Sequence, residues 1–113
     1  MNNQNIDSFS KTCPAAELRI TAIEDLAELT PGYLDHCRDH CRKISELLDH
    51  GDFDPIYAIA HGMKGSGGIY GFKMISQIAS WMASAAKANE TGETRRQIEN
   101  LLWYLDQVEV LYD

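Results

Sequence analysis

The stretch AHGMKGSGGIYG, residues 60–71, decides how this chain folds. Five of its twelve residues are glycine, and a glycine inside a helix costs about 1 kcal/mol relative to alanine. Two structures would make use of such a stretch: a loop that cradles phosphate, or a helix whose surface must stay bare. A Walker loop needs glycine, four residues and then Gly-Lys-Ser/Thr, whereas Lys64 here precedes Gly65 and Ser66. The sequence therefore favours the helix.

A helix over this stretch would place His61 on its outward face. At about 100° per residue, one side of the helix is apolar or small and would face a core. That side carries Ile56, Ile59, Met63, Gly67 and Tyr70. The residues within about 60° of His61 would face solvent: Tyr57, Ala58, Lys64, Gly65 and Gly68. A lone histidine is more often structural, but a histidine on this face has no core to sit in.

The imidazole of His61 would therefore be an exposed nucleophile. A neutral imidazole is a nitrogen nucleophile that acts near pH 7. Lys64, three residues on, would lie beside the ring and could neutralise charge on a phosphoryl group attached to it. Gly65 and Gly68 remove bulk, so that a partner's surface can come close. Nothing nearby binds a nucleotide or supplies a second catalytic acid, and the chemistry must come largely from that partner.

Turn residues divide the rest of the chain into helical segments. Thr30 and Pro31 predict a helix over 30–49, with Thr30 as its N-cap and Pro31 at the first helical position. Asp54-Pro55 repeats this pattern for a helix that ends before Gly71, and the last two helices are expected over 72–88 and 92–111. Short connections make sequential helices antiparallel neighbours. We expect an all-α fold, an up-down antiparallel four-helix bundle with a short extra N-terminal helix at 23–29.

Length and charge bound the possible functions. The 113 residues fit one domain, with a flexible segment over 1–16 and the bundle over 17–113. Ten basic against seventeen acidic residues give a formal net charge of −7, which disfavours binding to nucleic acid or anionic membranes. No apolar run approaches the ~20 residues that span a bilayer, and no signal region opens the chain. We therefore expect a cytoplasmic protein, with a monomer favoured.

His61, Lys64, Gly65, Ser66 and Gly71 resemble the motif of histidine-containing phosphotransfer (HPt) domains of multistep phosphorelays. That motif is His, two residues, Lys-Gly-(Ser/Ala), then a glycine further along, and the resemblance extends over 23–111. It implies that His61 accepts a phosphoryl group from an aspartyl phosphate of a receiver domain and passes it to another response regulator. Lys64 would steady the phosphoryl oxygens, and Gly65 would give the receiver room. Ser66 is expected to contact the backbone of a neighbouring helix, and Gly71 to end its own helix.

The resemblance also implies the partners of the chain. They would be response-regulator receiver domains, with that of a hybrid sensor kinase as a candidate. The chain would be a phosphoryl carrier without kinase activity and without a cofactor of its own, because the receiver would supply Mg²⁺. The docking face would mix apolar and small residues around the histidine. Its candidates are Tyr57, Ala58, Gly62, Gly65 and Gly68.

Two alternatives stay open. The bundle could bind a receiver or kinase as an unphosphorylated competitor, although the pairing of His61 with Lys64 favours phosphorylation. It could also be a metal- or haem-linked sensor, since two His and two Cys recur at i, i+4 spacing on one helix. These are His36, Cys37, His40 and Cys41. If that helix borders the face of His61, His36 or His40 could instead line the partner surface.

Overall fold

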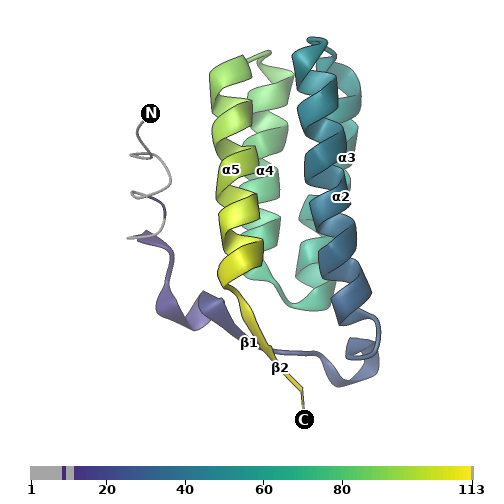
Figure 1. The fold of residues 1–113 in the computed structure, drawn as a ribbon, viewed down its shortest axis with the longest axis vertical. Coiled ribbons are helices and arrows are strands. Elements are labelled where there is room, and N and C mark those ends of the chain that lie inside the picture. The colour runs from purple at the N-terminus through teal and green to yellow at the C-terminus, as the bar shows by residue number, and fades with distance from the viewer. Residues whose placement is uncertain (1–8, 10–11, 113) are drawn as a thin grey trace.

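Four long helices run up and down side by side in the computed structural model, which describes residue 9 and residues 12–112 (Figure 1). They are α2 (Thr30–Asp49), α3 (Phe53–Tyr70), α4 (Lys73–Lys87) and α5 (Thr91–Gln107). The fold is therefore the expected all-α four-helix bundle. None of the helices described is long and apolar enough to cross a membrane.

The core lies along the axis of the bundle, where each helix buries one stripe of its surface. In α3 the buried residues recur at three- and four-residue spacing, as an amphipathic helix requires: Ile56, Ala60, Met63 and Gly67. Ile75, Ile78 and Met82 of α4 are fully buried against this stripe and the other helices. The face of α3 predicted to point inward does so, and its opposite face is left to solvent.

The starts of two helices differ from the prediction. Thr30 was expected to cap α2, but it is the first helical residue and Leu29 holds the cap position. A short 3₁₀ helix, η2 (Glu24–Leu26), leads into α2, and Leu29 is already in a helical conformation. The hydroxyl of Thr30 therefore donates backwards, to the carbonyl oxygen of Leu26 at 2.8 Å. The extra N-terminal helix is thus shorter than expected over 23–29. The third helix begins at Phe53, one residue before Asp54.

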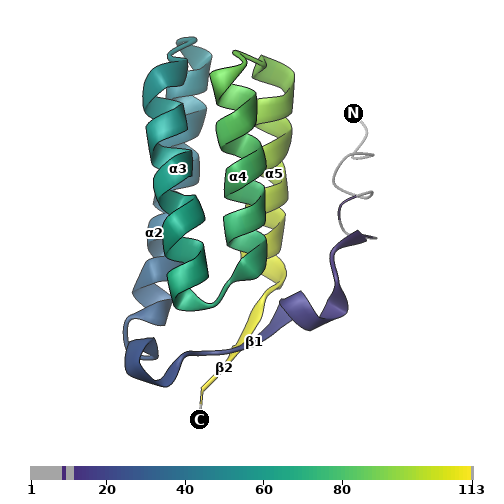
Figure 2. The ribbon, with the colours of Figure 1, turned by 180° about the vertical axis from the view of Figure 1, so that it is seen from behind.

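The last helix also ends earlier than predicted. α5 stops at Gln107, and the chain continues in extended conformation as strand β2 (Glu109–Leu111). This strand pairs in parallel with β1 (Arg19–Thr21), and the two cross the end of the bundle as a short ribbon (Figures 1 and 2). The prediction of helix to residue 111 was wrong because residues 109–111, with the β-branched Val110 opposite Ile20, pair with a strand from the N-terminal part of the chain.

Part of the N-terminal segment packs against the bundle. Residues 1–8, 10 and 11 lie outside the described residues, but Phe9 and Cys13 are buried. The ring of Phe9 meets that of Trp103 edge to face, with 5.4 Å between ring centroids. A 3₁₀ helix, η1 (Ala15–Leu18), follows, and the hydroxyl of Tyr104 donates to the carbonyl oxygen of Glu17 at 2.6 Å. These residues are therefore packed against the bundle, and the division into a flexible segment over 1–16 and a bundle over 17–113 stays a prediction.

Candidate functional site

His61 lies in the middle of α3 with an exposed side chain. Its imidazole faces the ring of Tyr57, one turn earlier, with 5.8 Å between ring centroids and 17° between their planes. The Nζ atom of Lys87, from α4, lies over the ring of Tyr57, 6.0 Å from its centroid. The imidazole thus stands on the outward face of a helix, flanked by an aromatic ring. The outward position of His61 is the one that the sequence predicted, whereas the stacking of its ring on Tyr57 was not predicted.

The helix surface around His61 is bare. Gly62, Gly65 and Gly68 are exposed, and a Cβ built on any of them would have no described atom within 4 Å beyond its immediate surroundings in the helix. Packing inside the protein therefore does not require glycine at these three positions. Each of them nevertheless weakens the helix by about 1 kcal/mol relative to alanine. The packing of the described residues therefore gives no reason for glycine at these positions, and their predicted place on a docking face stays a prediction.

Gly67, by contrast, serves packing. A Cβ at this position would lie 2.8 Å from the backbone nitrogen of Ser76 and 3.2 Å from Cγ2 of Ile75. Helix α4 therefore presses directly against α3 at this point. The hydroxyl of Ser76 also donates to the carbonyl oxygen of Lys64, at 2.7 Å. Together, these contacts hold the glycine-rich part of α3 in place beneath the exposed face.

Lys64 is exposed one turn after His61. Its side chain forms no salt bridge with any residue that the structure describes. The hydrogen bond from Ser76 to its carbonyl oxygen fixes its backbone, while its ammonium group remains in solvent. Lys64 is therefore exposed one turn from His61, and its role toward a phosphoryl group on the imidazole stays a prediction.

Ser66 and Gly71 have structural surroundings. The hydroxyl of Ser66 lies 2.9 Å from that of Tyr33 and donates to the carbonyl oxygen of Met63 at 3.3 Å. The expected contact with the backbone of a neighbouring helix was wrong, because the ring of Tyr33, stacked on Tyr70 at 4.1 Å, brings its own hydroxyl to Ser66. Gly71 ends α3 at φ +87°, a left-handed conformation that glycine adopts easily.

The four His and Cys residues of α2 do not converge. Cys37 and Cys41 are buried, and burial raises the pKa of Cys37 to about 11 and that of Cys41 to about 12. Their thiols therefore stay protonated at neutral pH, whereas metal ligation uses the thiolate. Among the described residues, no group of three or more His, Cys, Asp or Glu side chains could hold a metal ion.

His36 and His40 instead border the face of His61. Their ring centroids are 4.2 Å apart, and burial, followed by the proximity of His36, lowers the pKa of His40. Both line a groove of about 400 Å³ between α2 and α3, together with Ala58 and Gly62 of the predicted docking face. Helix α2 thus borders the helix face that carries His61, as the sequence left open, and a role of His36 or His40 toward a partner stays a prediction. Neither this groove nor Lys87 could be placed from the sequence, because both depend on which helices are neighbours.

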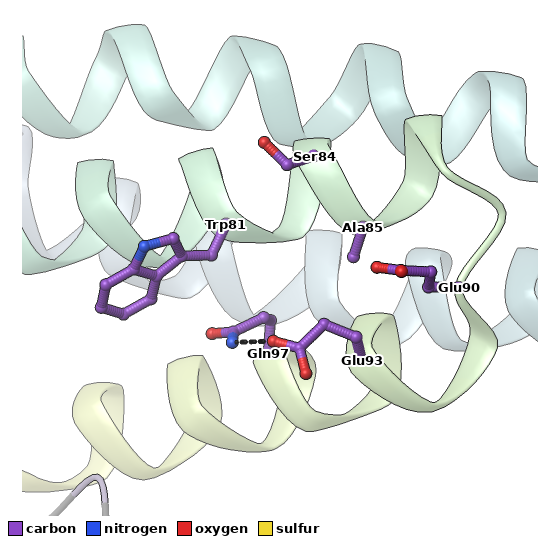
Figure 3. Close-up of a pocket in the computed structure, with 6 residues that line it drawn as sticks. All are labelled: Trp81, Ser84, Ala85, Glu90, Glu93 and Gln97. Carbon is purple, nitrogen blue, oxygen red and sulfur yellow. Dashed lines mark hydrogen bonds between the residues drawn. The ribbon is translucent and has the colours of Figure 1, made fainter.

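A second groove lies between α4 and α5, away from His61 (Figure 3). It has a volume of about 580 Å³ and is lined by Trp81, Ser84, Ala85, Glu90, Glu93 and Gln97. The amide of Gln97 donates to a carboxylate oxygen of Glu93 at 2.8 Å. The charged residues that line this groove are carboxylates, which repel phosphate. No described histidine lines the groove, so it offers no imidazole nucleophile. The chemistry is therefore better assigned to the outward face of α3.

Comparison with known families agrees with this geometry. A family model with the description "Hpt domain" matches residues 28–110, which includes all four helices of the bundle and His61. No curated protein and no solved structure matches the chain.

Proposed function

The chain belongs to the Hpt-domain family, and on that premise we propose that it carries a phosphoryl group on His61 between receiver domains. Hpt domains have a histidine phosphotransfer role in phosphorelays, interact with the receiver domains of response regulators, and are carriers rather than kinases. The observation that carries the proposal is the exposed imidazole of His61 on a helix face that three glycines leave bare. A cytoplasmic location stays a prediction.

The transfer step follows from this arrangement. An unprotonated ring nitrogen of His61 attacks the phosphorus of an aspartyl phosphate on the receiver and forms a P–N bond. The P–O bond to the aspartate breaks, and the carboxylate leaves with the electron pair. The ring carries its remaining proton on the other nitrogen, from which solvent can remove it. The reverse sequence, on a second receiver, returns the phosphoryl group to an aspartate.

Two charged groups would assist this step. The ammonium group of Lys64 can donate hydrogen bonds to the phosphoryl oxygens, and charge-assisted bonds of this kind are stronger than neutral ones. We place the Mg²⁺ of the reaction in the acidic pocket of the receiver.

The proposal is tested by incubating the chain with receiver domains that carry labelled aspartyl phosphate, after removal of the phosphodonor. We expect label to move from at least one receiver to this chain. The product should be stable in base and labile in acid, as a phosphohistidine is. Binding of a phosphorylated receiver without any transfer would contradict the proposal and favour the unphosphorylated competitor.

Substitution of Lys64 with alanine is expected to slow transfer about tenfold. This factor corresponds to the loss of about 1.4 kcal/mol of transition-state stabilisation by the ammonium group. The variant should keep its helical content, since the side chain of Lys64 is exposed and forms no salt bridge with a described residue. Single-turnover rates from a phosphorylated receiver measure the effect. Lys43→Ala is the matched control, because Lys43 is an exposed lysine of α2. Equal rates for the two variants would remove the role assigned to Lys64.

A further inference from the structure

His36 and His40 hold their rings against each other on α2, with 4.2 Å between centroids and 66° between planes. Four residues separate them, so both side chains lie on the same side of the helix, one turn apart. Neither ring forms a hydrogen bond or a salt bridge with any residue that the structure describes. Their nitrogen lone pairs are therefore available, and neutral imidazole is the commonest metal ligand in proteins.

The separation of the two rings suits one shared metal ion. With a metal–nitrogen bond of about 2.0–2.1 Å, and about 1.1 Å more to the ring centre, an ion would lie about 3.2 Å from each centroid. Two centroids 4.2 Å apart then subtend about 80° at the ion. This angle is closer to the roughly 90° between neighbouring ligands of a square-planar or octahedral ion than to a tetrahedral angle. Rotation about the soft χ2 torsion of each histidine can turn one ring nitrogen toward the ion.

The groove between α2 and α3 leaves room for the remaining ligands. Both imidazoles line it, and its volume is about 400 Å³. A water molecule takes up about 30 Å³, so an ion with several waters fits. No third His, Cys, Asp or Glu completes a site among the described residues. Two protein ligands with water in the other positions make an open site, from which an ion can exchange, rather than a closed structural one.

We propose that His36 and His40 form a binding site for an exchangeable divalent transition-metal ion, with Cu²⁺ as the ion bound most tightly. Two imidazole nitrogens with water oxygens match the square-planar or tetragonal coordination that is typical of Cu²⁺ and Ni²⁺. The affinity of such ligands along the divalent series is highest for Cu²⁺. The thiols of Cys37 and Cys41 take no part, because both side chains are buried in the core.

A bound ion would also change the surroundings of His61, and this consequence rests on the proposed function. Ala58 and Gly62, two residues of the predicted docking face, line the same groove as the two imidazoles. A hydrated dication in the groove occupies space that a receiver covering these residues needs. Metal binding and receiver docking should therefore exclude each other, so that the ion acts as a brake on phosphotransfer.

The site is tested by titrating the chain with Ni²⁺ in a calorimeter, since Ni²⁺ does not oxidise the thiols. One equivalent is expected to bind. Replacing a residue that only orients a ligand costs about 10–100-fold in metal affinity, so His36→Gln or His40→Gln should weaken binding at least about tenfold. The electron paramagnetic resonance spectrum of one equivalent of Cu²⁺ should show coupling to two nitrogens, and to one in either variant. His50→Gln and His61→Gln are the matched controls and should leave both measurements unchanged.

Three outcomes of these titrations would overturn the site. They are the absence of binding, binding that persists when His36 and His40 are both replaced, and loss of binding in His61→Gln, which would place the ion on the phosphoryl acceptor. The exposed position of His36 makes His36→Gln safe for the fold, and thermal melting without metal checks this.

The brake is tested separately, by the rate of transfer from a phosphorylated receiver with and without saturating Ni²⁺. The ion should slow the unmodified chain and leave His36→Gln unaffected, and this comparison removes any effect of Ni²⁺ on the receiver itself. Equal slowing of both would contradict the brake while the site stands. A chain that binds the ion at His36 and His40 but accepts no phosphate would keep the site and lose the proposed function.

Discussion

Substitution of His61 with glutamine is expected to reduce phosphorylation of the chain to background. The amide nitrogen of glutamine has its lone pair delocalised into the carbonyl group and cannot attack phosphorus. Glutamine is nevertheless polar, uncharged and a better helix former than histidine. His61 is exposed and its described ring contact is with Tyr57, so the substitution removes no core packing. Loss of transfer with an unchanged melting temperature would therefore report chemistry rather than folding.

The matched control for this variant is His50→Gln. The chain has four histidines, and His50 lies at the C-terminal cap of α2, where its Nδ1 is 2.8 Å from the carbonyl oxygen of Glu46. It lines neither the groove of His36 and His40 nor the face of His61. Transfer should proceed normally in this variant. Base-stable label that persisted in His61→Gln would mean that another histidine accepts the phosphoryl group.

The sequence predicted the helix α3 in spite of the four glycines inside it. Propensity alone would have broken the helix, but the residues opposite His61 are apolar at helical spacing, and Gly71 stands where a helix can end. Burial of that apolar stripe outweighs the glycine cost, since most helical stability in proteins comes from packing. The exposure of His61 followed from the same spacing, because at about 100° per residue His61 lies opposite the apolar stripe. Periodicity was therefore sufficient to place the candidate nucleophile.

Features that depend on distant parts of the chain could not be predicted in this way. The strand over residues 109–111 exists because it pairs with residues 19–21, and its one valine, Val110, does not by itself distinguish a strand from the end of a helix. The partner of Ser66 is a hydroxyl from another helix, brought there by the stacking of Tyr33 on Tyr70. Ile69 was not placed on either face of α3 from the sequence, and only the assembled bundle shows that its side chain is exposed.

Gly67→Ala and Gly68→Ala are expected to change stability in opposite directions, although the two residues are adjacent in one helix. Alanine gains about 1 kcal/mol of helix propensity over glycine at either position. At Gly68 nothing opposes that gain, because a Cβ there would have no described atom within 4 Å beyond its immediate surroundings in the helix. The melting temperature should rise by about 4 °C, since 1 kcal/mol corresponds to roughly that shift in a domain of this size.

At Gly67 the added methyl group meets the backbone of α4. The nitrogen of Ser76 lies 2.8 Å and its Cα 3.2 Å from the built Cβ, and neither can move unless the helix moves. Overpacking of this kind costs about 1–3 kcal/mol, and more when rigid backbone must shift. Because the contacted atoms are backbone, we take the upper part of that range, about 2–3 kcal/mol. After the propensity gain of about 1 kcal/mol, a net loss of about 1–2 kcal/mol is expected, which lowers the melting temperature by about 4–8 °C.

The displacement of α4 should also reach the functional face. The hydroxyl of Ser76 that holds the carbonyl oxygen of Lys64 belongs to the same residue that the new methyl group pushes away. Amide hydrogen exchange in Gly67→Ala should therefore quicken around Lys64, and calorimetry of the two variants gives the stability change directly. A rise in stability for both variants would show that α3 and α4 have room between them. The glycine at position 67 would then belong with the bare surface rather than with the core.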